Sequence, residues 1–147
     1  MRFIRILILS LLVIGTVYLS LFFYFQRTQL NTYNNLLTDL NQLYDLSIKG
    51  QKPLNSNCNK VMGYMFESKQ NDNYKLVEWC NNGYYVFKNI DLNKNIVSID
   101  PLFPTTTFKI NGSFTNLSDN NQITLKRRYL GKNYEIVITV DGEVLGD

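Results

Sequence analysis

The chain begins with an uncharged apolar stretch that constrains where the rest of it can fold. Residues 6–25 read ILILSLLVIGTVYLSLFFYF, and the flanking arginines are Arg2, Arg5 and Arg27. A helix of this length rises about 1.5 Å per residue and spans about 30 Å, which matches the hydrocarbon core of a bilayer. We therefore expect residues 6–25 to form a transmembrane helix whose partner is the lipid bilayer.

A cleaved secretory signal is the alternative for this stretch. The apolar core of such a signal is usually about 7 to 15 residues long and ends at a small-x-small cleavage site. The nearest approach to that site is Val13-Ile14-Gly15, which lies in the middle of the apolar run. The sequence therefore favours an uncleaved anchor.

The flanking charges predict how the anchor is oriented. Arg2, Arg5 and the terminal amine precede the stretch, whereas only Arg27 follows it closely. Because the cytoplasmic flank of a membrane helix carries the excess of positive charge, we expect residues 1–5 to form a cytoplasmic N-terminus. The protein is then a single-pass protein of the inner (cytoplasmic) membrane, with its C-terminal domain periplasmic or extracellular.

The charge of the remaining chain is balanced. Setting aside Arg2, Arg5 and Arg27 from the 15 basic residues leaves 12 in residues 28–147, equal to the 12 acidic residues. Nucleic-acid binding requires a basic face on the folded part, so we expect no nucleic-acid partner. This length suffices for one domain with its own core.

Two cysteines, Cys58 and Cys80, are the only ones in the chain. Disulfides persist outside the cytoplasm, so we expect these two cysteines to pair. The bond would lower the entropy of the unfolded chain and so stabilise the fold by about 3 kcal/mol. Free thiols are the alternative and would require a cytoplasmic domain. A metal site is not expected, because the chain contains no histidine and no CxxC spacing.

Residues 26–49 predict an amphipathic helix. No proline or glycine separates Phe25 from Leu46, so we expect one continuous helix that Gly50 ends. A coiled-coil seam should run through more heptads than this stripe does, and we favour packing on the following sheet over dimerisation. The apolar residues recur every three or four positions: Leu30, Tyr33, Leu36, Leu37, Leu40, Leu43 and Tyr44.

Residues 50–147 predict a β-rich extracytoplasmic domain, so the fold class is α+β, with a C-terminal antiparallel sheet of about five to seven short strands. Short turns rich in asparagine and glycine favour a meander, and pairs such as Asn120-Asn121 read as solvated turn residues. Pro101 and Pro104 mark a break between two halves, since proline cannot donate to a strand ladder. The candidate strands are 61–66, 74–79, 84–90, 96–99, 106–110, 123–130 and 134–140.

Catalytic motifs are missing from the sequence. Without histidine there is no Ser-His or Cys-His pair, and no glycine-rich phosphate loop is present. Glu67, Glu78 and Asp91 lie in or beside predicted strands, and we interpret them as solvated charges. We expect no enzymatic activity, no catalytic residue and no cofactor.

Two groups of residues are candidates for a binding surface: Lys126 with Arg128, and Tyr84 with Tyr85. Strand alternation places Lys126 and Arg128 on one face and Arg127 on the other. We interpret these charges as those of an edge strand, where they prevent aggregation, and contact with anionic lipid or an acidic partner is the alternative. Adjacent tyrosines in a strand point to opposite faces, so one of the two is expected to be exposed.

The order of anchor, amphipathic helix and disulfide-bearing sheet resembles the general layout of type IV pilins and pseudopilins. Those proteins are cut after a glycine that precedes an apolar residue, with a glutamate at the fifth mature position. Here Gly15 precedes Thr16, and the fifth residue after it is Ser20. The resemblance is one of layout, and no family is assigned from it.

These patterns predict a membrane-anchored binding or structural protein. We expect an accessory subunit of a bacterial envelope assembly, such as secretion or pilus-like machinery, with other envelope proteins as partners. An envelope inhibitor or immunity protein that blocks an enzyme, and a small sensory ligand-binding domain, are the alternatives.

Overall fold

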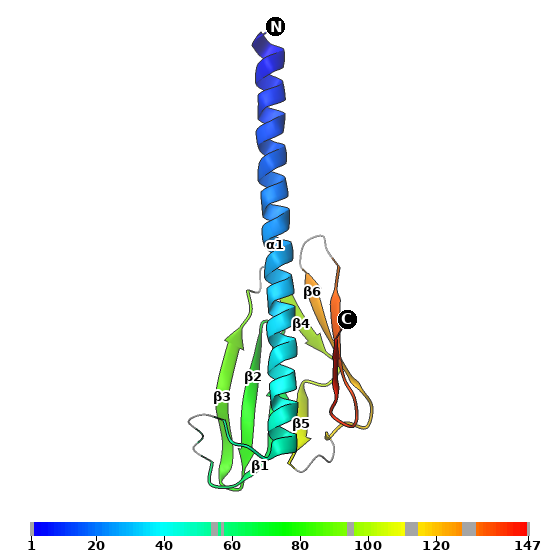
Figure 1. Cartoon of the computed structure of the whole chain (residues 1–147). Helices are drawn as coiled ribbons and strands as arrows, with labels where there is room; N and C mark the ends of the chain where they lie inside the picture. The colour runs from blue at the N-terminus through cyan, green and yellow to red at the C-terminus, as the bar shows by residue number, and fades with distance from the viewer. Residues whose placement is uncertain are drawn as a thin grey trace.

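The computed structural model of the chain describes residues 2–53, 56, 58–93, 96–110, 115–127 and 132–146. Within them, one long helix, α1 (Arg2–Lys49), accompanies eight strands in two antiparallel sheets. The first half of α1 extends beyond the strands, and its second half lies along them (Figure 1). The predicted α+β class and the single continuous helix are confirmed.

The strands divide equally between two sheets, which we call sheet A and sheet B. Sheet A has the order β3-β2-β1-β5 and sheet B has the order β4-β6-β7-β8. The strands of sheet A are β1 (Val61–Glu67), β2 (Asn73–Cys80), β3 (Gly83–Asp91) and β5 (Thr105–Lys109). Those of sheet B are β4 (Val97–Pro101), β6 (Asn121–Arg127), β7 (Tyr134–Ile138) and β8 (Val144–Gly146).

The arrangement differs from the expected single meander. All seven predicted strands form, the strand predicted over 123–130 being described as far as Arg127, but β8 adds an eighth. Consecutive strands pair only within β1-β2-β3 and β6-β7-β8, because β5 pairs with β1 and β4 pairs with β6. The groups β1-β2-β3 and β6-β7-β8 are therefore joined by β4 and β5. Of these two, β4 lies in sheet B with the later group and β5 lies in sheet A with the earlier one.

The chain changes sheets three times, and the crossing from β4 to β5 takes place at the predicted proline break. Pro101 ends β4 in sheet B, and the chain enters β5 in sheet A just after Pro104. A buried asparagine holds this crossing: Asn121 Nδ2 donates to Phe103 O at 3.0 Å and to Thr106 Oγ1 at 2.8 Å, and its Oδ1 accepts from Phe103 N at 2.9 Å. The expectation that Asn121 is solvated is wrong, because its side chain pairs with polar groups inside the molecule.

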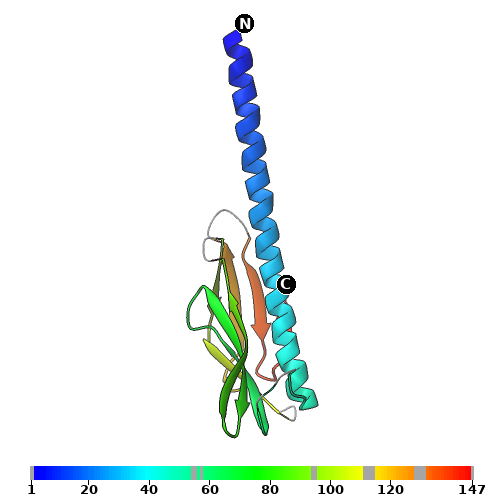
Figure 2. The same ribbon diagram turned by 90° about the vertical axis from the view of Figure 1, so that its left-hand side faces the viewer.

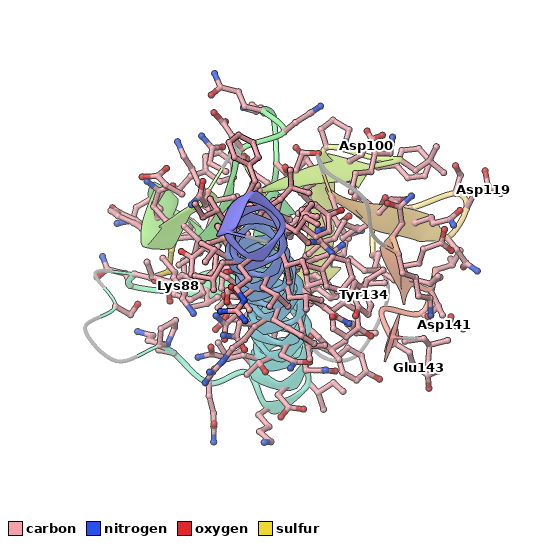
Figure 3. All side chains as sticks on the ribbon, turned by 90° about the horizontal axis from the view of Figure 1, so that it is seen from above. Lys88, Asp100, Asp119, Tyr134, Asp141 and Glu143 are labelled. Carbon is pink, nitrogen blue, oxygen red and sulfur yellow. A yellow bond between two sulfur atoms is a disulfide. The ribbon has the colours of Figure 1, made fainter. Side chains whose placement is uncertain are left out.

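One core is shared by the helix and both sheets. The buried members on α1 are Tyr33, Leu36, Leu40 and Leu43, four of the seven residues in the predicted apolar stripe. Seen from above, Lys88 of sheet A and Tyr134 of sheet B lie on either side of α1 (Figure 3), and in the side view the strands lie on one side of the helix (Figure 2). The predicted packing of the stripe on the strands is confirmed. The core residues from the strands include Tyr64, Phe66, Tyr74 and Leu76 of sheet A and Ile123, Leu125, Ile136 and Ile138 of sheet B.

The segment after the helix is fixed at two points. Gly50 has a φ of 60°, the left-handed conformation that commonly ends a helix, and α1 stops at the residue before it. Cys58 and Cys80 form the predicted disulfide, with their Cα atoms 5.7 Å apart. The disulfide joins the residues before β1 to the end of β2.

Gly63 gives a test of the pairing between β1 and β5. A Cβ added there would meet the backbone oxygen of Phe108 at 2.6 Å, so Gly63→Ala is expected to lower the free energy of unfolding by about 1–3 kcal/mol. Gly15→Ala is the control, because nothing lies within 4 Å of its added Cβ. Thermal unfolding of both variants in detergent, followed by circular dichroism, measures the difference. Equal unfolding midpoints would contradict the close approach of these strands.

Candidate functional site

The bare half of α1 is the largest exposed apolar feature in the described part of the chain. From Phe3 to Leu21, its large hydrophobic side chains are between 49% and 85% exposed. At about 1.5 Å per residue this stretch is about 28 Å long, close to the thickness of a hydrocarbon core. The helix is long and apolar enough to cross a membrane, and a signal sequence shares these two properties.

The hydroxyl groups on this bare stretch are satisfied by the helix itself. Ser10 Oγ donates to Leu7 O at 2.8 Å, Thr16 Oγ1 donates to Val13 O at 2.9 Å, and Ser20 Oγ donates to Thr16 O at 2.9 Å. A hydroxyl group without a hydrogen-bond partner costs about 4–8 kcal/mol to transfer from water into a hydrocarbon such as cyclohexane. These three residues are therefore compatible with a lipid environment.

The folded domain meets the helix at the lower end of the bare stretch. The guanidinium of Arg127 lies 5.2 Å from the ring centre of Phe22 and 5.8 Å from that of Phe25, and its Nη2 donates to Phe22 O at 3.4 Å. A turn further along, Gln29 Nε2 donates to Lys132 O at 2.8 Å. The end of β6 thus contacts the last residues of the predicted span, and the residues before β7 contact the helix just beyond it.

An ion pair with a buried carboxylate and a partly exposed lysine joins the second half of α1 to sheet A. Asp39 Oδ2 accepts a hydrogen bond from Tyr74 Oη at 2.8 Å, and its Oδ1 accepts one from Lys88 Nζ at 2.5 Å. Burial, followed by the negative charge of Asp39, raises the pKa of Tyr74. The Asp39 side chain is only 4% exposed, so this cluster holds the helix against β2 and β3.

A second buried carboxylate lies beside the disulfide. Glu78 is 1% exposed, and Ser56 Oγ lies 2.7 Å from one of its carboxylate oxygens and 2.8 Å from the other. The interpretation of Glu78 as a solvated charge is wrong, because its carboxylate is buried and bonded to Ser56 from the segment before β1. Glu67 is half-buried with Lys69 Nζ at 3.9 Å, and Asp91 is exposed.

The atoms near Glu78 have the composition of a metal site. Cys58, Glu78 and Cys80 each offer one ligand atom, and these atoms lie within 4.8 Å of one another. The thiolate is the form of cysteine that binds a metal, and here the two sulfurs are bonded to each other. With the disulfide formed, only the carboxylate of this group is available as a ligand.

The predicted binding residues do not form one surface. Tyr84 is 65% exposed at the start of β3, whereas Tyr85 is half-buried and its hydroxyl accepts a hydrogen bond from Asn82 Nδ2 at 2.9 Å. Lys126 lies in sheet B, where it forms an ion pair with Asp100. Arg128 lies outside the described residues.

The position of β6 corrects one further expectation. This strand lies between β4 and β7, so the interpretation of its charges as those of an edge strand is wrong. Lys126 is exposed, while Arg127 is half-buried on the face that carries the buried Leu125. Sequence reasoning overlooked Arg127 because its contact with α1 joins residues 105 positions apart.

The chain was compared with protein-family models, with curated proteins and with solved structures, and no match was found in any of the three.

Replacing Asp39 tests the tie between α1 and sheet A. Asp39→Ala leaves the buried Tyr74 hydroxyl without its acceptor, so we expect a loss of about 2–3 kcal/mol in the free energy of unfolding. Asp45→Ala removes an ion pair on the same helix whose side chains are 56% and 63% exposed, and should change it by less than about 1 kcal/mol. Urea unfolding of both variants measures these losses, and similar values would show that the Asp39 cluster is not structural.

Tyr64 predicts a loss of stability at alkaline pH. Its side chain is fully buried and donates to the backbone oxygen of Gln51. Burial, followed by the charge of Glu78, raises its pKa to about 12, compared with about 10 in an unfolded chain. The folded state therefore holds this proton more tightly, and its contribution is complete below pH 10 and lost as pH rises through 12.

Tyr64→Phe removes this titration. Urea unfolding across the same pH range should show a smaller loss of stability in the variant than in the unmodified chain. For each protein, the free energy of unfolding at alkaline pH is compared with its own value at neutral pH, because the variant also loses the hydrogen bond to Gln51. Parallel curves would contradict the assignment.

Proposed function

We propose that this protein is a single-pass membrane-anchored subunit of a bacterial envelope assembly, in which its extracytoplasmic domain has a binding or structural role. The observation that carries the proposal is the continuity of α1. Its bare half and the half that is buried in the core belong to one helix, and no flexible linker separates them. A protein built in this way holds its domain at a fixed height and rotation above a bilayer.

Two observations support a domain outside the cytoplasm. Arg2 and Arg5 precede the uncharged stretch 6–25, and positive charge is more abundant on the cytoplasmic flank of a membrane helix. Cys58 and Cys80 lie in bonding geometry, and such bonds are maintained in the periplasm or outside the cell. Both favour an N-terminus inside and a domain in the periplasm or beyond.

The titratable groups support a binding role over catalysis. Asp39 and Glu78 are the two buried carboxylates among the described residues, and each already accepts hydrogen bonds from its neighbours. They lie in separate clusters, one against α1 and the other beside the disulfide. Two carboxylates that act together in hydrolysis face one substrate from about 5–10 Å apart. Asp39 and Glu78 instead belong to two different clusters, which favours a structural role for each.

An inhibitor or immunity protein is the second candidate. The observation that favours it is an exposed apolar pair on β3, an outer strand of sheet A: Tyr84 is 65% exposed and Val86 is 54% exposed. Outer strands that carry exposed aromatic residues suit recognition of another chain. An inhibitor would use such a surface to cover one enzyme.

Affinity purification of the tagged full chain from detergent-solubilised membranes separates the two candidates. The subunit proposal predicts that several membrane proteins are recovered with it. A control chain lacking residues 2–21 keeps Phe22 and the whole buried stripe, and should lose these partners. Recovery of the full chain alone would contradict the proposal, and tight binding of one soluble enzyme by the control chain would favour an inhibitor.

A further inference from the structure

We propose that the end of sheet B nearest the bare helix binds the headgroups of anionic phospholipids in the bilayer that α1 crosses. The inference rests on the proposed membrane anchoring of α1. The surface consists of Arg127 at the end of β6 and Lys132 before β7, and we call these two residues the basic collar.

The collar lies at the height where a headgroup layer is expected. If α1 crosses a bilayer, the contact of sheet B with α1 at Phe22 ends the hydrocarbon core near Leu21 within the predicted span 6–25. The interface then begins near Phe22, over whose ring the Arg127 guanidinium lies at 5.2 Å. The backbone oxygen of Lys132 accepts a hydrogen bond from Gln29. Gln29 lies about two turns, or about 10 Å, along the helix from Phe22. Headgroup regions add roughly 5–8 Å on each side of the core, so the collar covers this layer.

The collar is short of negative partners. In the part of the chain that the structure describes, salt bridges engage Lys49, Lys69, Lys88 and Lys126, but none engages the two collar residues. The Nε of Arg127 is buried without a hydrogen-bond acceptor among these residues, and its Nη2 reaches only the backbone oxygen of Phe22, at 3.4 Å. Because Nε itself is buried, an added anion would bond the terminal Nη groups, whose planar donors match phosphate oxygens.

The neighbours of Arg127 favour lipid over a soluble anion. Its guanidinium lies over the rings of Phe22 and Phe25, so any ligand approaches along an apolar helix. Aromatic rings combined with cationic side chains are typical of the membrane interface, where long side chains keep their charge in the headgroup layer. Each cation close to an anionic membrane surface is worth roughly 1 kcal/mol, which is about a fivefold change in an equilibrium.

The test uses the full chain in nanodiscs of phosphatidylcholine alone, or of phosphatidylcholine and phosphatidylglycerol in equal parts. Hydrogen exchange is measured for backbone amides of β6 and β7. In the anionic discs we expect exchange near the collar to slow by about fivefold, and the effect to shrink at high salt. Inorganic phosphate added to the neutral discs should not reproduce it.

Three substitutions make the test specific. Arg127→Gln and Lys132→Gln should each reduce the lipid-dependent protection, whereas Lys126→Gln should leave it intact. Lys126→Gln is the matched control, since it removes one charge from the same strand on the face that carries the ion pair with Asp100. Lys132→Gln keeps the test valid if Arg127→Gln loosens the domain, because the side chain of Lys132 is exposed.

The outcomes separate this inference from the anchoring proposal. Failure of the chain to enter either kind of disc would overturn both. Stable insertion with equal exchange in neutral and anionic lipid would overturn the headgroup inference and leave the anchor standing. Equal loss of protection in Lys126→Gln and Lys132→Gln would show a general charge effect, which also overturns it.

Discussion

The structure depends on one helix that meets two different surroundings along its length. Over residues 3–21, α1 exposes apolar side chains all round, and from Tyr33 to Leu43 it buries a stripe against the strands. The change occurs between Phe22 and Gln29, where sheet B first touches it. Packing of the stripe on the strands sets the rotation of α1 about its own axis. Because both halves belong to one helix, this rotation also determines which side of the bare half lies above sheet A and which lies above sheet B.

Buried polar groups make that rotation specific. Apolar stripes tolerate small slips, but a buried polar side chain needs its own partners. Asp39 finds them only in Tyr74 and Lys88 of sheet A, and Gln29 finds its partner in the backbone beside sheet B. Asn121 then ties sheet B to the crossing into sheet A. The helix is thus held to both sheets, and the sheets to each other, by groups that apolar packing alone would not align.

Local patterns predicted the elements well, and the failures concern what lies far apart in the chain. The spacing of Tyr33, Leu36 and Leu40 and the position of Gly50 predicted the helix and its end, and β-branched runs predicted seven strands. The pairing of β5 with β1 carries no local signal, because it is decided by tertiary packing. The burial of Glu78 and Asn121 was missed for the same reason, since their partners come from other segments. The three residues of β8 are too few to show alternation.

The unbroken helix makes the domain behave as the far end of a lever. Lys49 lies about 40 Å along the axis from Phe22. Transmembrane helices tilt by about 20° on average, and such a tilt would carry the Lys49 end sideways by about 14 Å. Bilayer thickness changes helix tilt, so a thinner or thicker membrane would move the distal loops of this domain across the surface with no change in their fold. If α1 is anchored as proposed, the reach of the domain is set by the lipid as well as by the chain.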